Sequence, residues 1–180
     1  HTINRSISIT GLGYVGLPIA IAFDETIKVI GFDVNQSRVD ELKNGIDRTG
    51  EVKSDTLRKS NINFTSDFNE LSKANFHIIT VPTPIDDAKK PNLKPLLSAS
   101  KTIGKILKKG DIVVYESTVY PGVTEDECSP ILESQSGLKC GEDFFLGYSP
   151  ERINPGDKKN TLNTIVKIIS AQDQNTLNII

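Results

Sequence analysis

Three glycines have the spacing that binding of a pyrophosphate would need. Gly11, Gly13 and Gly16 form the pattern Gly-x-Gly-x-x-Gly directly after the apolar alternation of residues 6–10. In this pattern the first glycine permits a sharp turn, the second lets backbone approach the phosphates, and the third lets a helix pack against a sheet. The unpaired N–H groups at the start of that helix would favour the anion. The chemistry indicated is dinucleotide binding.

An acidic residue at the end of the next apolar run supports this interpretation. Residues 27–32 lead into Asp33, about 20 residues after the glycine turn, where a carboxylate would accept hydrogen bonds from the adenosine ribose hydroxyls. A 2′-phosphate at this position would meet a like charge, so the sequence predicts NAD rather than NADP as the cofactor. The alternative is that Asp33 only caps a helix over residues 35–44.

Polar side chains also follow later apolar runs. Thr83 lies between Pro82 and Pro84, where it would contact the cofactor or simply belong to a turn after a strand. Thr118 would hold a water or a cofactor group through its hydroxyl, or form a turn before a proline. Because parallel strands end at one edge of a sheet, these residues are expected beside the same crevice.

The pair Glu151-Arg152 follows a further apolar run, residues 144–148. Glu151 would act as a general base, and Arg152 would recognise a phosphate or a carboxylate. The alternative is a solvated pair of opposite charges with no chemical role.

The elements that position these residues alternate between strand and helix, with short connections rich in Gly, Pro, Asn and Asp. This alternation predicts an α/β fold with a doubly wound, mostly parallel Rossmann-like sheet and helices on both faces. Strands are predicted at residues 6–10, 27–32, 62–64, 75–81, 111–115, 144–148 and 164–169. Helices are predicted after the glycine turn and at residues 35–44, 67–73, 93–107 and 123–132, with a short one within 47–60.

Length and charge limit the classes of protein that fit. The 180 residues predict one domain, and a formal net charge of −2 with interspersed signs gives no reason to expect nucleic acid or an anionic membrane as a partner. No apolar run approaches the length of a membrane span, so a soluble chain is expected. The chain begins with His1 and contains no Met, which indicates that it is not an untouched translation product.

The cysteines and histidines are not promising catalytic groups. Cys128 and Cys140 form neither a disulfide framework nor a metal-binding spacing, so we expect structural thiols, no metal and a cytoplasmic location. His1 is terminal, and His77 lies inside a strongly apolar run. We therefore expect His77 to be a hydrogen-bonded core residue.

Five motifs follow one another along nearly the whole chain. They are GLGYVGLP at residues 11–18, GFD at 31–33 with Arg38, VPTP at 81–84, ESTVYPGVTE at 116–125 and GYSPERINPGD at 147–157. Taken together, these motifs resemble the UDP-glucose/GDP-mannose dehydrogenase family. The last two are most similar to the branch that oxidises UDP-N-acetylhexosamines such as UDP-GlcNAc and UDP-GalNAc, which includes the enzymes of Vi-type capsular antigen synthesis.

The resemblance implies a reaction as well as a fold. Such enzymes oxidise the C6 alcohol of a nucleotide sugar to a carboxylate with two NAD molecules in succession. A cysteine captures the aldehyde, and the resulting thioester is hydrolysed. The resemblance implies that this chain serves the synthesis of a surface polysaccharide, with a UDP-N-acetylhexosamine as the substrate partner.

The family's roles transfer position by position. Glu151 and Thr118 would be catalytic, orienting or activating the hydrolytic water. Glu151, Arg152, Ile153 and Asn154 would line the sugar nucleotide site. The residues implied to bind NAD are Gly11, Gly13, Tyr14, Val15, Gly16, Asp33, Arg38, Thr83 and Thr118, with Arg38 lying along the adenosine.

Two departures from the family's pattern bear on activity. Pro155 stands where UDP-glucose members commonly carry a second acid. The family's catalytic cysteine, lysine and asparagine would lie beyond Ile180, in a middle helical segment and a second α/β domain. Residues 1–180 are therefore expected to be the NAD-binding domain alone and inactive in isolation, within a protein that forms a homodimer or higher oligomer.

Other functions stay open at this stage. Within the enzyme class, the substrate would instead be UDP-glucose or UDP-N-acetylmannosamine. In another class, the chain would be a non-catalytic NAD-sensing module, although such a module would not need the motifs at residues 116–125 and 147–157.

Overall fold

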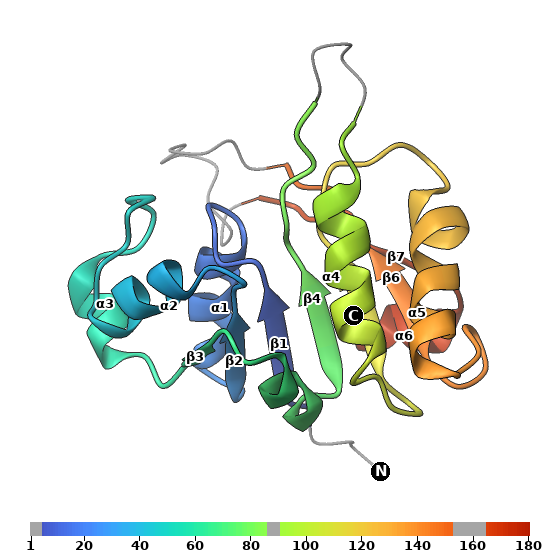
Figure 1. Ribbon diagram of the computed structural model, residues 1–180, viewed down its shortest axis with the longest axis horizontal. Coiled ribbons are helices and arrows are strands. Elements are labelled where there is room, and N and C mark those ends of the chain that lie inside the picture. Colours follow the sequence, from blue (N-terminus) through green and yellow to red (C-terminus); the bar gives the residue numbers. More distant parts are fainter. Residues whose placement is uncertain (1–4, 86–90, 153–164) are drawn as a thin grey trace.

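A computed structural model describes residues 5–85, 91–152 and 165–180 of the chain. The predicted doubly wound sheet is confirmed, with seven strands in these ranges in the order β3-β2-β1-β4-β5-β6-β7 (Figure 1). The first six are parallel, and β7 runs antiparallel to β6. The strands are β1 (Ile7–Thr10), β2 (Val29–Phe32), β3 (Asn63–Thr65), β4 (Phe76–Ile79), β5 (Ile112–Tyr115), β6 (Phe145–Tyr148) and β7 (Ser170–Ala171).

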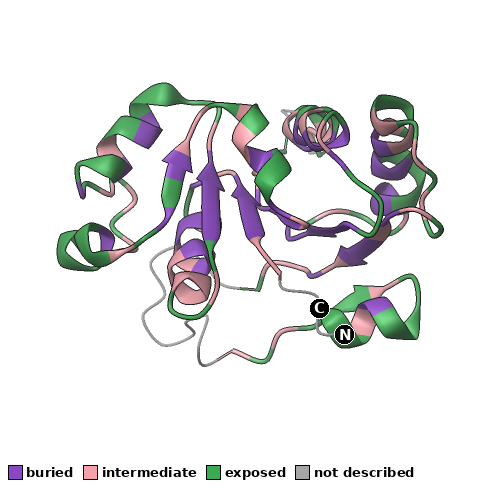
Figure 2. Cartoon of the chain, turned by 90° about the horizontal axis from the view of Figure 1, so that it is seen from below, coloured by how far each residue is buried: buried purple, intermediate pink, exposed green. Residues whose placement is uncertain are grey.

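Helices cover both faces of this sheet, as Figure 2 shows. On one face, apolar side chains of α1, α2 and α3 form a core with Ile9 and Ile78. On the other, side chains of α4 and α5 pack on Ile79 and Val113. The helices are α1 (Gly16–Asp24), α2 (Gln36–Lys43), α3 (Ser54–Lys59), α4 (Lys94–Gly104), α5 (Ser129–Ser136) and α6 (Gln174–Ile179), with a 3₁₀ helix, η1 (Phe68–Lys73), and a π-helical segment, η2 (Val123–Cys128).

The four central strands are buried on both faces, which explains their nearly continuous apolar sequences. Every residue of β1, β2, β4 and β5 is buried. The direction of strand succession reverses between β1 and β4, because the chain first adds β2 and β3 on one side and then returns to the other. Ligands of open α/β sheets bind at such a reversal, beyond the carboxyl ends of the strands.

The prediction of a last strand at residues 164–169 is wrong for the part that the structure describes. The strand is Ser170–Ala171, and its register pairs Tyr148 with Ser170. Val166 is 79% exposed, so its apolar side chain does not face the core. Alternation by itself does not make a strand, since a ladder also needs a partner edge.

The helix predicted at residues 123–132 is present, but it is not one regular α-helix. The segment is divided between η2 and α5, and Pro130 stands in the first turn of α5. Proline has no N–H to donate to a preceding turn, so a regular ladder cannot run through this position. The short helix α6 was not predicted. Its N-cap Asp173 accepts a hydrogen bond from the Thr176 amide at 2.8 Å.

His77 is a core residue, as predicted. Its ring is fully buried, shares a 2.7 Å hydrogen bond with Ser8 Oγ and lies 3.4 Å from Asp111 Oδ2. Within the described ranges, both cysteines are free thiols and no cluster of residues suited to a metal ion occurs. No helix in those ranges is long and apolar enough to cross a membrane.

Candidate functional site

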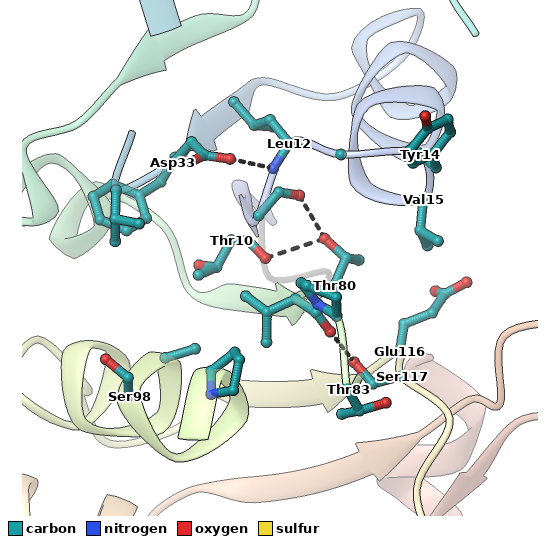
Figure 3. A pocket seen from close by; sticks show the side chains of 18 of the residues that line it. Thr10, Leu12, Tyr14, Val15, Asp33, Thr80, Thr83, Ser98, Glu116 and Ser117 are labelled. Carbon is teal, nitrogen blue, oxygen red and sulfur yellow. Dashed lines mark hydrogen bonds between the residues drawn. The ribbon is translucent and has the colours of Figure 1, made fainter. Parts of the chain in front are cut away.

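A cavity of about 590 Å³ lies at the carboxyl edge of the sheet, where the sequence predicts the site. It is bordered by the loops that follow β1, β2, β4 and β5, and Figure 3 shows their side chains converging. The predicted site residues among those lining it are Gly11, Gly13, Tyr14, Val15, Asp33, Thr83, Thr118 and Glu151.

Gly11 and Gly16 have the geometry that was expected of them. Gly11 has a φ of +96°, a left-handed conformation that suits glycine, and its amide donates to Phe32 O at 2.8 Å. A Cβ on Gly16 would overlap Gly11 O and Thr80 Oγ1, so only glycine lets α1 begin here. A Cβ on Gly13 would meet nothing within 4 Å. Packing within the chain therefore does not require a glycine at position 13, and close approach of a pyrophosphate to its backbone stays a prediction.

Asp33 lies beside this turn and lines the cavity. Its Oδ2 accepts from the Leu12 amide and its Oδ1 from the Asn35 amide, both at 2.9 Å. The N-cap of α2 is Asn35, whose side chain accepts from the Arg38 amide at 3.3 Å. Asp33 is thus not the cap of that helix. Each of its carboxylate oxygens keeps acceptor capacity for a ribose hydroxyl.

Arg38 lies outside the set of cavity-lining residues, although the resemblance implies that it contacts the adenosine. Its side chain is buried: Nε donates to Leu12 O at 2.8 Å and Nη2 donates to Asp47 Oδ1 at 2.7 Å. The structure therefore shows Arg38 connecting the glycine turn to the loop after α2. A direct contact with the cofactor stays a prediction.

Asp47 gathers the donors of its own loop around one buried carboxylate. Besides Arg38, it accepts hydrogen bonds from Thr49 Oγ1 and from the amides of Thr49, Glu51 and Val52. Burial alone would raise the pKa of Asp47, but the hydrogen bonds from Thr49, Arg38 and the backbone lower it below its ordinary value. The sequence offers no signal for this arrangement beyond a polar stretch.

Thr80 is a second residue that sequence reasoning missed. It is buried at the end of β4, and its Oγ1 lies 2.7 Å from Gly11 O and 3.1 Å from Thr10 O, a hydroxyl shared between two carbonyls of the glycine turn. The turn is therefore connected to β4 as well as to α2. A threonine at the end of an apolar run gives no sign of this contact, because its partners lie about 70 residues earlier.

The loops after β4 and β5 are joined by two further hydrogen bonds. Thr83 Oγ1 donates to Thr118 O at 2.7 Å, and Ser117 Oγ donates to Val81 O at 2.8 Å. Thr83 and Thr118 were predicted as separate ligands of the cofactor. The structure brings them together on one wall of the cavity.

Glu116 and Lys167 form an ion pair next to the cavity, and neither was singled out from the sequence. Glu116 is buried at the end of β5 and lines the cavity, while Lys167 belongs to the segment before β7. Burial lowers the pKa of Lys167 to about 8. The adjacent carboxylate of Glu116 favours the charged form of the ammonium.

The loop after β6 is described only in part. Glu151 reaches the cavity, whereas the exposed Arg152 donates from Nη1 to Val166 O at 2.9 Å and does not line it. Ile153 and Asn154, expected at the sugar nucleotide site, lie outside the described residues.

These features fit a dinucleotide. Open space at Gly13 lies near the start of α1, and the carboxylate of Asp33, which keeps acceptor capacity, lines the same cavity. A bound NAD would supply a hydride acceptor, and the chain's own residues would bind and orient it. Thr118 and Glu151 line the same cavity and offer a hydroxyl and a carboxylate that suit the orientation of a water.

Comparison with known proteins agrees with this geometry. The family model for the NAD binding domain of the UDP-glucose/GDP-mannose dehydrogenase family matches residues 5–180. Protein CapL of Staphylococcus aureus is 59% identical over 177 residues, which are 98% of this chain and 42% of that protein. A UDP-N-acetyl-D-glucosamine 6-dehydrogenase of Pseudomonas aeruginosa is 56% identical over 165 residues, 91% of this chain and 39% of that protein.

Solved structures give the same relationship. The NDP-N-acetyl-D-galactosaminuronic acid dehydrogenase of Methanosarcina mazei Go1 has a TM-score of 0.87 at 30% identity, covering 97% of this chain and 40% of that one. The chain thus spans about 40% of the length of these relatives. Since the family model accounts for nearly every residue, this chain belongs to the UDP-glucose/GDP-mannose dehydrogenase family and corresponds to its NAD-binding domain.

Proposed function

We propose that the chain is the NAD-binding part of a dehydrogenase that oxidises the C6 alcohol of a UDP-N-acetylhexosamine to the uronate. The observation that carries the proposal is that Asp33, at the expected cofactor end, lines the same cavity as Thr118 and Glu151. A module that only sensed NAD would use Asp33 and Thr118 to bind the cofactor but would have no use for Glu151.

The residues divide the work between binding and orientation. The turn at Gly13 and the carboxylate of Asp33 would hold the pyrophosphate and the adenosine ribose. Thr118 would orient the hydrolytic water, and Glu151 would accept its proton or position it. Arg152, with Ile153 and Asn154, would line the sugar nucleotide site. These roles follow the family resemblance and the shared cavity.

The substrate class rests on the similarity of relatives. Identity is 56% with UDP-N-acetyl-D-glucosamine 6-dehydrogenases of Pseudomonas aeruginosa and Salmonella typhi, against 34% with a UDP-N-acetyl-D-mannosamine dehydrogenase of Pyrococcus horikoshii. We therefore expect a UDP-N-acetylhexosamine substrate and a role in surface polysaccharide synthesis. We also propose that the whole protein is a cytoplasmic homo-oligomer whose remaining domains carry the nucleophilic cysteine.

The test has two parts. Calorimetric titration of NAD into the 180-residue chain should give saturable binding that Asp33→Ala weakens, without turnover of any UDP-sugar. The longer protein containing this chain should reduce NAD with UDP-GlcNAc or UDP-GalNAc more efficiently than with UDP-glucose or UDP-ManNAc. Absence of NAD binding by both proteins would refute the proposal. A preference for UDP-glucose would change the substrate class, and a preference for UDP-ManNAc would keep the N-acetylhexosamine class with another sugar configuration.

A further inference from the structure

Two carboxylates mark opposite ends of the cavity, and they are paired differently. In Figure 3, Asp33 lies on one side of the labelled side chains and Glu116 on the other. Asp33 accepts hydrogen bonds from two backbone amides, which are neutral donors. Glu116 is instead paired with the full positive charge of Lys167. The first end therefore keeps its negative charge, while the second is close to neutral.

The pair at Glu116 and Lys167 is sheltered from solvent. The two side chains are 7% and 26% exposed, respectively, so water screens their field less than it would at the surface. The pair also joins distant parts of the chain, since Glu116 follows β5 and Lys167 precedes β7. Removing either partner would leave one unpaired charge at this end of the cavity.

The identity of the ligand group at this end follows from the doubly wound fold. A dinucleotide with its ribose at Asp33 and its pyrophosphate at the start of α1 crosses the reversal point toward β4 and β5. Its second base then belongs at the end that Glu116 lines. That base is the nicotinamide, which carries a positive charge in NAD⁺ and none in NADH.

We propose that the Glu116–Lys167 ion pair sets the relative affinity of this site for NAD⁺ and NADH. An unpaired carboxylate would favour the cationic ring of NAD⁺ and hold the oxidised cofactor, whereas an unpaired ammonium would favour NADH. The pair removes most of this bias, so that neither redox form is retained. The inference rests on the proposed function, because it requires that NAD occupies the cavity.

Removing Lys167 and removing Glu116 should change the relative affinity for NAD⁺ and NADH in opposite directions. At an effective dielectric near 20, one unpaired charge several ångströms from the ring changes a binding constant by about fivefold or more. Lys167→Gln should therefore raise the ratio of the NADH to the NAD⁺ dissociation constant at least about fivefold, and Glu116→Gln should lower it by a similar factor. The double variant should return close to the wild-type ratio.

The experiment is calorimetric titration of both cofactors into the 180-residue chain and its variants at one pH and one ionic strength. Lys139→Gln is a matched control, since it removes a lysine from an exposed pair with Glu142 that does not line the cavity. Thermal unfolding establishes that each variant is folded. Each single variant tests one direction of change in the ratio of the two dissociation constants. If one variant does not fold, the other still tests the proposal.

The outcomes separate the inference from the proposed function. Opposite shifts of the two single variants, with compensation in the double variant, would support the charge mechanism. Equal weakening of NAD⁺ and NADH in both variants would overturn it, because the pair would then act only on the shape of the site. If the wild-type chain and the longer protein bind neither cofactor, the proposed function itself fails.

Discussion

The buried guanidinium of Arg38 is expected to stabilise the fold by holding the glycine turn in place. Its side chain is 6% exposed and that of Asp47 is 1% exposed, and the 2.7 Å bond between them is charge-assisted. Arg38→Ala removes this bond and the 2.8 Å bond to Leu12 O. We expect the variant to fold less stably and to hold the turn less firmly.

The magnitude follows from the two bonds. A hydrogen bond between charged groups contributes about 1.5–3 kcal/mol, and the carbonyl left unsatisfied costs about 1 kcal/mol or more. The cost stays below that of a fully orphaned buried charge, because Asp47 keeps its bonds to Thr49 and to the loop amides. A loss of about 3 kcal/mol corresponds to a decrease in Tm of about 6–12 °C for a domain of this size.

Arg48 provides the matched control. It also pairs with a carboxylate, Glu41 Oε2 at 2.6 Å, but its side chain is 47% exposed. An exposed pair contributes at most about 1 kcal/mol, so Arg48→Ala should lower Tm by no more than about 4 °C. Arg38→Lys should recover only part of the loss, since an ammonium lacks the planar fork that reaches both acceptors.

Thermal and urea unfolding of the four proteins test this reasoning. A Tm of Arg38→Ala within about 2 °C of that of Arg48→Ala would refute it. Full recovery by Arg38→Lys would show that charge alone, and not the two-sided bridge, provides the stability.

The remaining predictions concern the turn, the cofactor and acid stability. Gly16→Ala should lower the free energy of unfolding in urea by about 1–3 kcal/mol or more, because the added Cβ overlaps Gly11 O. Gly13→Ala should unfold like the wild type, because its Cβ meets nothing, yet it should bind NAD at least about tenfold more weakly in calorimetry. NADP should bind at least about tenfold more weakly than NAD, and Asp33→Ala should narrow that difference; equal affinities in the wild type would show that Asp33 does not face the ribose. The lowered pKa of Asp47 contributes stability above its unfolded value of about 3.8, and this contribution disappears as the pH falls below that value. The stability difference between wild type and Asp47→Asn should therefore be constant near neutrality and shrink as the pH falls below about 4. A difference that stays constant throughout would contradict the assignment.

The architecture, and the position of the glycine turn and Asp33 at one cavity, could be predicted from local features of the sequence. The turn at Gly11 needs a positive φ, and helix α1 needs a residue without a Cβ at Gly16, so both requirements appear directly as residue types. The buried strands appear in the sequence as apolar runs. Each signal lies within a few residues of the feature that it predicts, which is why it can be found without a structure.

The tertiary structure decided the contacts between residues that are far apart in the chain. Arg38 belongs to one of the five sequence motifs, but its burial against Leu12 and Asp47 depends on how α2 packs against the glycine turn. The partner of Glu116 is Lys167, about 50 residues later, and no spacing rule joins them. The wrong strand at 164–169 has the same cause, since a strand exists only where a neighbouring edge accepts it. Sequence specifies local backbone preferences, whereas side-chain partners and strand edges are selected by packing of the whole chain.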